Sequence, residues 1–319
     1  MLLFFAGAAL GYFGNDLLKN SSNDFVEKRE GSYRFINPLL ECDAAGKTMK
    51  RKELVPFEHK VNEVVSQSIQ QGKAQAVTVY FRELNDGIWF SIGETERFVP
   101  ASLRKVPLMI SLLKQAEADP AFLSKQIKNN LSKDHTAQQS FRPAESIKPG
   151  GSYTVDELIY RMIVYSDNNA FALLTSIVDA AELRKTYTKL SIGRPSIPLQ
   201  DDYLSVMTYA SFFRILYNAT YLNREYSERA LEYLSNAYFD RAIVAGVPRN
   251  ITVAHKFGEH IDIPGGSKQL HDCGIVYFPN HPYLVCIMSR GTDFNALSET
   301  MRAVSGVIYE NMAQQHAGH

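Results

Sequence analysis

A hydroxyl and an amine lie three residues apart in segment 100–105 (PASLRK), as Ser102 and Lys105. Side chains at positions i and i+3 of a helix share one face, so these two groups can touch. A serine hydroxyl is a weak nucleophile until a base takes its proton. A lysine can be that base when burial and nearby cations lower its pKa. A Ser-x-x-Lys pair is weak alone, because it arises by chance about once in a chain of this size.

Two further segments carry polar groups where an apolar pattern would be natural. Ser166, Asp167 and Asn168 interrupt a helical period. They predict either a helix end with a cap, or a second hydroxyl that relays a proton beside an amide that holds substrate. Lys256 lies inside a β run and is followed by Gly258. A lysine there is usually at an edge or facing solvent, and the glycine indicates close approach of another backbone or a ligand.

The three motifs occur in the order Ser-x-x-Lys, Ser-Asp-Asn and Lys-x-Gly, on a helix start, a break between helices and a strand. With this order the chain resembles the class A β-lactamase-like family of penicillin-recognising serine hydrolases. The resemblance covers about residues 55–316. It implies that Ser102 is the acylated nucleophile and that Lys105 is its general base, directly or through a water. It also implies that Ser166 relays the proton to the leaving nitrogen.

The same resemblance implies the substrate contacts. Asn168 is expected to contact the substrate amide, and Lys256 to help bind the substrate carboxylate. Gly258 and Glu259 complete the substrate-binding set, and the backbone N–H groups of Ser102 and Glu259 are expected to form the oxyanion hole.

Two departures from the family pattern bear on activity. Phe257 stands where the family carries Thr or Ser, so a hydroxyl that would hold the substrate carboxylate is missing. The Glu-x-x-Leu-Asn setting of the deacylating glutamate is absent from the sequence. Asp201 and Asp202 are weak candidates for that carboxylate, and they are explained more simply as a solvated pair before a helix capped by Ser205. Without a positioned carboxylate, the acyl-enzyme is expected to hydrolyse slowly.

Hydrophobic periodicity predicts the elements that position these groups. Helices are expected over 56–71, 102–118, 154–163, 169–180, 205–216 and 295–312, and strands over 76–84, 88–92, 252–257, 271–278 and 283–290. Strands at both ends with helices between them predict an α+β fold. Its antiparallel sheet is expected to combine residues 55–100 with residues 250–316 and to be flanked by N- and C-terminal helices. An inserted all-helical lobe is expected to span residues 101–249. This is a β-lactamase/transpeptidase-like arrangement with its site in the cleft between the parts.

The N-terminal region is expected to lie outside the catalytic domain at 55–316. Residues 1–14 are almost all apolar and indicate a membrane anchor or signal remnant, or else a buried element of the fold. Residues 15–54 are interpreted as a polar linker, which favours an extracytoplasmic location. Cys273 and Cys286 lie opposite each other if the intervening turn is centred at 279–280, so they either form a disulfide or pack as small apolar residues.

Composition limits the partners. The 34 basic and 34 acidic residues give zero net charge, which argues against nucleic acid. A metal cluster of His255, His260, His271 and Cys273 lacks the tight spacing of known zinc motifs, so neither a metal nor a cofactor is predicted. The chain is expected to be a monomer.

The leading hypothesis is a serine hydrolase that forms an acyl-enzyme and opens a β-lactam amide. The alternatives are a D,D-peptidase or penicillin-binding-type enzyme acting on peptidoglycan peptides, a sensor that binds a ligand or is acylated by it without turnover, and a purely structural cell-envelope domain.

Overall fold

The computed structural model describes residues 26–43, 51–190, 203–262 and 266–316. Its centre is a five-stranded sheet whose neighbouring strands are all antiparallel, in the order β4-β3-β9-β8-β7. The strands are β3 (Ala76–Glu83), β4 (Trp89–Ile92), β7 (Val253–Ile261), β8 (Lys268–Val276) and β9 (Tyr283–Gly291). Since β3 pairs with β9, the sheet joins both halves of the chain, as the strand pattern predicts.

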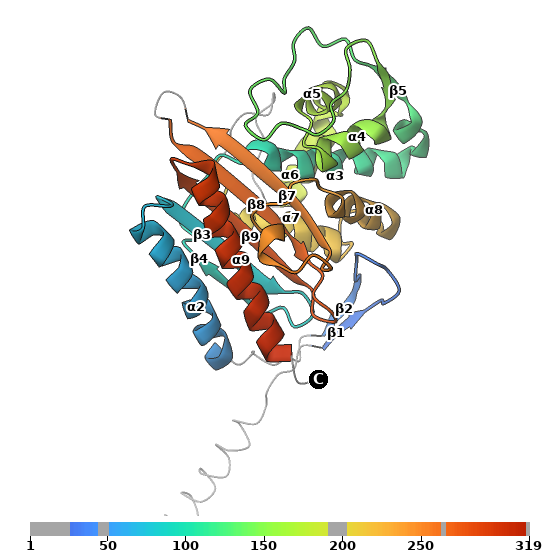
Figure 1. The fold of residues 1–319 in the computed structure, drawn as a ribbon. Helices are drawn as coiled ribbons and strands as arrows, with labels where there is room; N and C mark the ends of the chain where they lie inside the picture. Colours follow the sequence, from blue (N-terminus) through green and yellow to red (C-terminus); the bar gives the residue numbers. More distant parts are fainter. Residues whose placement is uncertain (1–25, 44–50, 191–202, 263–265, 317–319) are drawn as a thin grey trace, which may run out of the picture.

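Two long helices, α2 (Arg51–Gln70) and α9 (Phe294–His316), lie side by side on one face of this sheet (Figure 1). The apolar stripe of α2 buries Phe57, Val61 and Val65 in the core beneath it. The helix begins at Arg51, before the expected start at residue 56. It ends before Gly72, whose φ of 71° suits a residue without a side chain.

The inserted lobe covers the other face of the sheet and contains a larger apolar core. Its helices are η1 (Ala101–Arg104), α3 (Lys105–Ala118), η2 (Pro120–Ser124), α4 (Val155–Val164), α5 (Asn168–Ile177), α6 (Ala180–Lys189), α7 (Val206–Tyr217) and α8 (Arg224–Ser235). A last short helix, η3 (Val244–Gly246), ends the inserted segment and packs on α9 instead. The lobe is not entirely helical, because β5 (Gln126–Lys128) and β6 (Ser152–Thr154) pair as a short hairpin-like sheet.

Side-chain caps start the helices near the site. Thr154 accepts from the Glu157 N–H at 3.0 Å, and Ser205 accepts from the Thr208 N–H at 3.2 Å, as their positions predict. The helices α6 and α8 were not expected from the periodicity, although Asp179 and Asn223 cap them in the same manner. Both are rich in polar residues, which weakens the apolar period on which the prediction depends.

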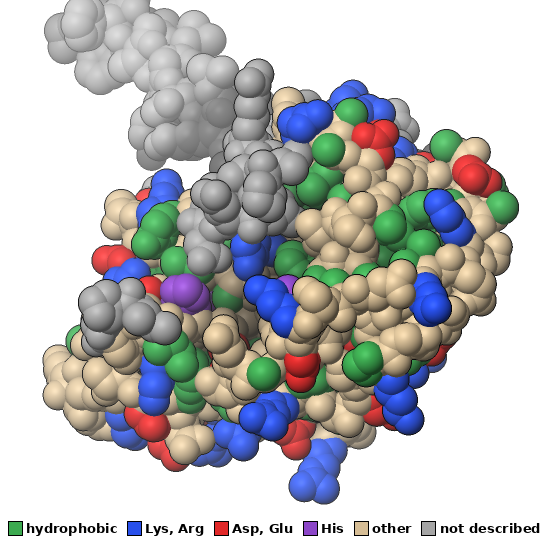
Figure 2. Space-filling model, turned by 90° about the horizontal axis from the view of Figure 1, so that it is seen from above, with side chains coloured by type: hydrophobic (Ala, Val, Ile, Leu, Met, Phe, Trp, Pro, Cys, Tyr) green, Lys and Arg blue, Asp and Glu red, His purple; other side chains and the backbone are tan. Residues whose placement is uncertain are grey.

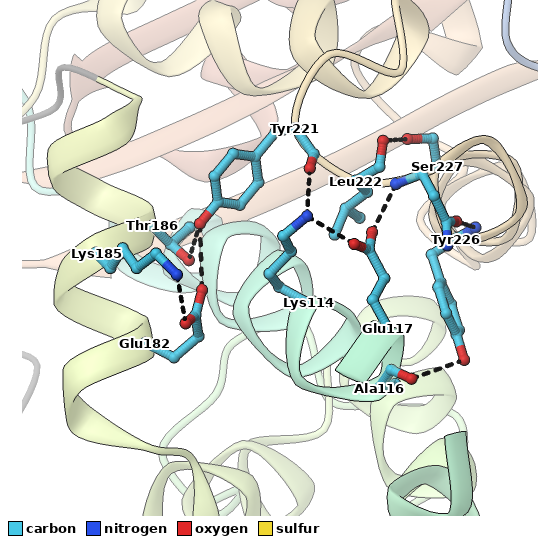
Figure 3. Close-up of polar contacts among 11 residues, drawn as sticks. Lys114, Ala116, Glu117, Glu182, Lys185, Thr186, Tyr221, Leu222, Tyr226 and Ser227 are labelled. Atoms are coloured by element: carbon cyan, nitrogen blue, oxygen red, sulfur yellow. Dashed lines mark hydrogen bonds and ion pairs between the residues drawn. The ribbon is translucent and has the colours of Figure 1, made fainter. Parts of the chain in front are cut away.

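Polar contacts connect the lobe helices to the segment between α7 and α8 (Figure 3). Lys114 of α3 donates to the Glu117 carboxylate at 2.6 Å and to the Tyr221 carbonyl at 2.8 Å. The Tyr221 hydroxyl lies 3.1 Å from Thr186 Oγ1 and 3.4 Å from Glu182 Oε1 on α6. These contacts fix the positions of α3, α6 and the α7–α8 connection relative to one another. They bear on the site because α3 begins at Lys105, the lysine of the Ser-x-x-Lys motif.

Part of the expected linker at 15–54 instead belongs to the folded body. Strands β1 (Val26–Arg29) and β2 (Leu39–Asp43) pair antiparallel, and the connection between them buries Phe35 and Ile36. The N–H groups of Arg34, Phe35 and Ile36 donate to the Glu228 carboxylate of α8. Polar composition concealed this attachment because a single half-buried carboxylate, distant in sequence, satisfies three backbone donors.

Within the described part of the chain, no helix is both long and apolar enough to cross a membrane. The apolar residues 1–14 lie outside the described residues, so the predicted anchor or signal segment is not tested.

Cys273 and Cys286 face each other on β8 and β9 and form a disulfide. The register that places them opposite is the one predicted from a turn centred at 279–280. Both cysteines are fully buried, and the bond joins two inner strands of the sheet.

Replacing both cysteines with serine should lower the free energy of unfolding by about 2–4 kcal/mol, because the bond closes a loop of sequence separation 13 in the unfolded chain. Urea unfolding monitored by circular dichroism measures the change. Cys42→Ser is the matched control, since Cys42 lies outside the pair. Equal unfolding free energies for the double variant and the wild type would contradict a stabilising role.

Candidate active site

Three distant segments of the chain meet at the hydroxyl of Ser166. Lys105 Nζ donates to Ser166 Oγ at 3.0 Å, to the Ser166 carbonyl at 2.6 Å and to Asn168 Oδ1 at 2.7 Å. Lys256 Nζ donates to the same Ser166 Oγ at 2.9 Å and to the Phe257 carbonyl at 2.9 Å. The structure therefore brings together Lys105, Ser166, Asn168 and Lys256 of the predicted site.

The backbone at Ser166 has an uncommon conformation that aims its side chain between the two amines. Ser166 has φ of 55°, in the left-handed region that non-glycine residues seldom adopt. Asp167, fully buried, holds this break in place: its carboxylate accepts from the N–H groups of Ile147 and Asn169 and from the Ser146 hydroxyl. The helix cap expected in this segment is confirmed, because Asp167 caps α5.

Ser102 is the second residue of η1, immediately before α3, and its side chain is half-buried. Its hydroxyl makes no hydrogen bond to any residue that the structure describes. The preceding residue, Ala101, has φ of 49°, so the chain turns sharply into this short helix. The partners of Lys105 Nζ are atoms of Ser166 and Asn168, so a hydrogen bond between Ser102 and Lys105, which the spacing allows, is not formed here. A half-buried hydroxyl without a partner is available for reaction, whereas a hydroxyl already bonded within the protein would have to exchange partners first.

Gly258 allows strand β7 to pass directly against the segment that carries Ser102. A Cβ at this position would lie 3.0 Å from the Pro100 carbonyl oxygen and 3.2 Å from the Leu103 nitrogen. Such separations are tighter than ordinary contacts of a Cβ with backbone atoms, so a side chain would push β7 away from η1. The close approach predicted from this glycine is confirmed, and the approaching chain is the protein's own backbone.

Both lysines are fully buried, and this controls their protonation. Burial lowers the pKa of Lys105 well below its usual value, and the positive charge of Lys256 lowers it further. Burial lowers the pKa of Lys256 to about 7, although Asp272 and Glu259 act in the opposite direction. Among the described residues, no carboxylate forms an ion pair or hydrogen bond with either amine, so their hydrogen-bond acceptors are neutral.

Phe257 makes the surroundings of Lys256 apolar where the family pattern has a hydroxyl. Its ring stacks on Phe239 at 4.1 Å between centroids and contacts Phe141 edge-on at 5.9 Å. Lys256 Nζ lies 4.3 Å from the centroid of the Phe257 ring, within the range of a cation–π contact. The missing hydroxyl is thus replaced by part of a packed aromatic cluster.

The remaining predicted residues have distinct environments. The side chain of Glu259 accepts from the N–H groups of Ser140 and Phe141, so it anchors the segment beside the site. Asp201 and Asp202, the weak candidates for a deacylating carboxylate, lie outside the described residues. Sequence reasoning missed Gln139, whose amide donates to the Ser166 carbonyl at 3.2 Å, because no spacing relates it to the motifs.

The rejected metal cluster does not form among its described members. Cys273 is in the disulfide, His255 Nδ1 lies 2.7 Å from Asp272 Oδ1, and His271 Nε2 lies 3.0 Å from the Val99 carbonyl oxygen.

Charge is mixed on the face seen from above (Figure 2). Lys and Arg side chains are spread across it, and Asp and Glu side chains lie between them. Basic and acidic side chains therefore alternate on the described residues of this face.

An antiparallel sheet joined to a mostly helical lobe, with a serine between two buried lysines, defines the class of β-lactamase- and transpeptidase-like serine hydrolases. The sequence profile described as the beta-lactamase enzyme family matches residues 56–312, and the chain belongs to this family. It is a serine hydrolase of the β-lactamase-like type. No curated protein matches the chain.

Solved structures show the same fold at low identity. A PBP-A mutant, described as an acyl-enzyme complex with penicillin G, is 23% identical with a TM-score of 0.65, and the match covers 82% of this chain and 97% of that one. A β-lactamase from Xanthomonas campestris pv. campestris is 19% identical with a TM-score of 0.67, over 80% and 98% of the two chains. A β-lactamase from Chitinophaga pinensis is 17% identical with a TM-score of 0.69, over 81% and 99%.

The lowered pKa of Lys256 predicts a pH dependence of stability. Between pH about 7 and 10.5, the unfolded chain binds more protons at this lysine than the folded protein does. The unfolding free energy of the wild type should therefore rise with pH in this window relative to Lys256→Met, by at most about 1.4 kcal/mol per pH unit. Urea unfolding at pH 7, 8 and 9 measures the difference. Lys125→Met, which removes an exposed lysine, is the control, and parallel pH profiles for wild type and Lys256→Met would refute the prediction.

Proposed function

We propose that Ser102 is the nucleophile of an acyl-enzyme mechanism and that Lys105 is its general base. Neutral Lys105 takes the Ser102 proton, directly or through a water, while Ser102 Oγ bonds to the carbonyl carbon of the substrate. The observation that carries the proposal is that two buried amines donate to Ser166 Oγ and that the hydrogen-bond acceptors of both amines are neutral. This environment lowers the pKa of Lys105, so a neutral base exists at a pH where an ordinary lysine would be charged.

Ser166 is the proposed proton relay to the leaving nitrogen. As the carbon–nitrogen bond breaks, the Ser166 proton passes to that nitrogen, and Lys105 returns the proton it took from Ser102. The hydrogen bond from Lys105 to Ser166 Oγ supplies this path. The N–H groups of Ser102 and Glu259 are proposed to stabilise the oxyanion, since preorganised donors act most strongly where charge develops.

A β-lactam is the proposed substrate, with Asn168, Lys256 and Gly258 as contacts. The PBP-A structure described as an acyl-enzyme complex with penicillin G supports this for the fold. In this chain the aromatic ring of Phe257 replaces the expected hydroxyl, so recognition of the substrate carboxylate falls to Lys256. We expect weaker preference for ordinary penicillins than a hydroxyl at this position would give.

Deacylation is proposed to be slow. The described residues place no carboxylate in hydrogen-bond contact with Ser102, Lys105 or Ser166, and the sequence lacks the Glu-x-x-Leu-Asn setting. The same observation favours the second candidate, a D,D-peptidase of the penicillin-binding type, which needs no such glutamate. It also supports the third candidate, a sensor that binds a ligand or is acylated by it without turnover.

An extracytoplasmic monomer is the proposed form of the protein, with 55–316 as its catalytic domain. The buried disulfide between Cys273 and Cys286 supports export, because such bonds persist mainly in oxidising compartments. Membrane attachment through residues 1–14 is part of this proposal.

Incubation with excess penicillin G should add the full mass of the drug to the chain, because ring opening releases no atoms. Intact-mass spectrometry measures the adduct. Ser102→Ala should abolish it, whereas Ser111→Ala, at a buried serine of α3 outside the site, should retain it. An adduct of undiminished yield on Ser102→Ala would overturn the assignment of the nucleophile.

Nitrocefin should give a burst of about one product per enzyme followed by a much slower steady rate, because acylation has a base and deacylation lacks a positioned carboxylate. Stopped-flow absorbance resolves the two phases. Sustained turnover without a burst contradicts slow deacylation. Release of D-Ala from a D-Ala-D-Ala peptide favours the peptidase, and a burst with no turnover of either substrate favours the sensor.

A further inference from the structure

A second group of reactive side chains lies away from the Ser166 site, at the end of the sheet reached by the last turn of α9 (Figure 1). It consists of Glu83 at the end of β3, His281 in the β8–β9 turn and His316 at the end of α9. One ligand atom from each of these side chains lies within 4.8 Å of the others. The proposed acyl-enzyme mechanism uses none of them.

The three side chains already contact one another in pairs. His281 Nδ1 lies 3.0 Å from Glu83 Oε1, and the rings of His281 and His316 stack with centroids 3.5 Å apart and an interplanar angle of 19°. Ligand nitrogen and oxygen atoms at a zinc ion lie about 2.0–2.2 Å from the metal, so two ligands of one ion are at most about 4.4 Å apart, and the three ligand atoms must come closer together by side-chain rotation to share one ion.

Among the described residues, the buried acid of this group has a histidine as its basic partner. The Glu83 side chain is only 3% exposed, it pairs with His281 Nδ1, and no described lysine or arginine forms an ion pair with it. The Asp86 carboxylate lies close enough to act on Glu83 electrostatically. A buried carboxylate next to another acid and two imidazoles is stabilised by a bound cation more than by solvent that cannot reach it.

The backbone around the group is held in position by contacts between two turns. Asn85 Nδ2 donates to the Asn280 carbonyl at 2.6 Å, and the Leu84 N–H donates to the Pro282 carbonyl at 3.0 Å. These bonds fix the end of β3 against the β8–β9 turn, so Glu83 and His281 are positioned before any ion binds. The third ligand, from α9, is placed by the stacking of His316 on His281 and by its contact with Phe278.

We propose that Glu83, His281 and His316 bind one Zn²⁺ ion that fastens the end of α9 to the sheet. Two imidazoles and one carboxylate are a ligand set that zinc accepts, and Mg²⁺ and Ca²⁺ prefer oxygen ligands. The fourth position is open to a water or to the exposed Asp86 carboxylate. Binding displaces any proton shared between Glu83 and His281, so it releases acid.

Titration of EDTA-treated, dialysed protein with ZnCl₂ in an isothermal calorimeter tests this site. The wild type should bind one equivalent, and His281→Ala and His316→Ala should each weaken binding about tenfold or more. MgCl₂ should give no saturable heat. The matched control is His59→Ala, which removes an exposed histidine that pairs with Glu63 at 3.2 Å on α2 and should leave the affinity unchanged.

A thermal melt provides the second measurement. Zn²⁺ should raise the melting temperature of the wild type and of His59→Ala, and should raise it much less for Glu83→Gln and His316→Ala. Circular dichroism without metal verifies that each variant is folded. Absence of saturable Zn²⁺ binding by the wild type, or full affinity in both His281→Ala and His316→Ala, would overturn the proposal.

Discussion

The amines of Lys105 and Lys256 are both buried and both donate to one oxygen, Ser166 Oγ. The rest of the site depends on how the protein accommodates two amines in its interior. Each ammonium group would be strongly disfavoured in an apolar interior without a counter-charge, and here the hydrogen-bond acceptors of both are neutral. The protein lowers the pKa of both lysines rather than neutralising them with carboxylates. The lowered pKa of each lysine is therefore a result of desolvation, and any group that admitted water or negative charge would diminish this shift.

The fold maintains this arrangement by joining three separate parts. The lobe provides Lys105 at the start of α3 and Ser166 at the break before α5, while the edge strand β7 of the sheet provides Lys256. Packing of β7 on η1, the buried Asp167 and the aromatic ring of Phe257 hold these segments at the required separation. The site is consequently a property of the junction between lobe and sheet.

Much of this arrangement follows from local sequence. The family resemblance carried by the motif order implies that Ser102, Lys105, Ser166 and Lys256 meet in one site, and the structure brings Lys105, Ser166 and Lys256 together. The cysteine register follows from the position of one turn. The helices α6 and α8 are harder to predict, because polar residues obscure their period.

Contacts between distant segments that carry no motif could not be predicted. The Glu228 carboxylate that accepts three N–H groups, and the Glu83–His281–His316 group, each depend on segments about 190 to 230 residues apart, and no sequence spacing relates their members. Gln139 is positioned in the same way by a loop whose path has no local signature.

Gly258 has a consequence for how such an enzyme can evolve. Because its missing side chain sets the distance between β7 and η1, any side chain introduced there would push the strand away from the turn that carries Ser102. Lys256 lies on the same strand, so its amine would be drawn away from Ser166 Oγ as well. A single hydrogen atom at one backbone carbon thereby restricts which inherited changes this junction of lobe and sheet can accept.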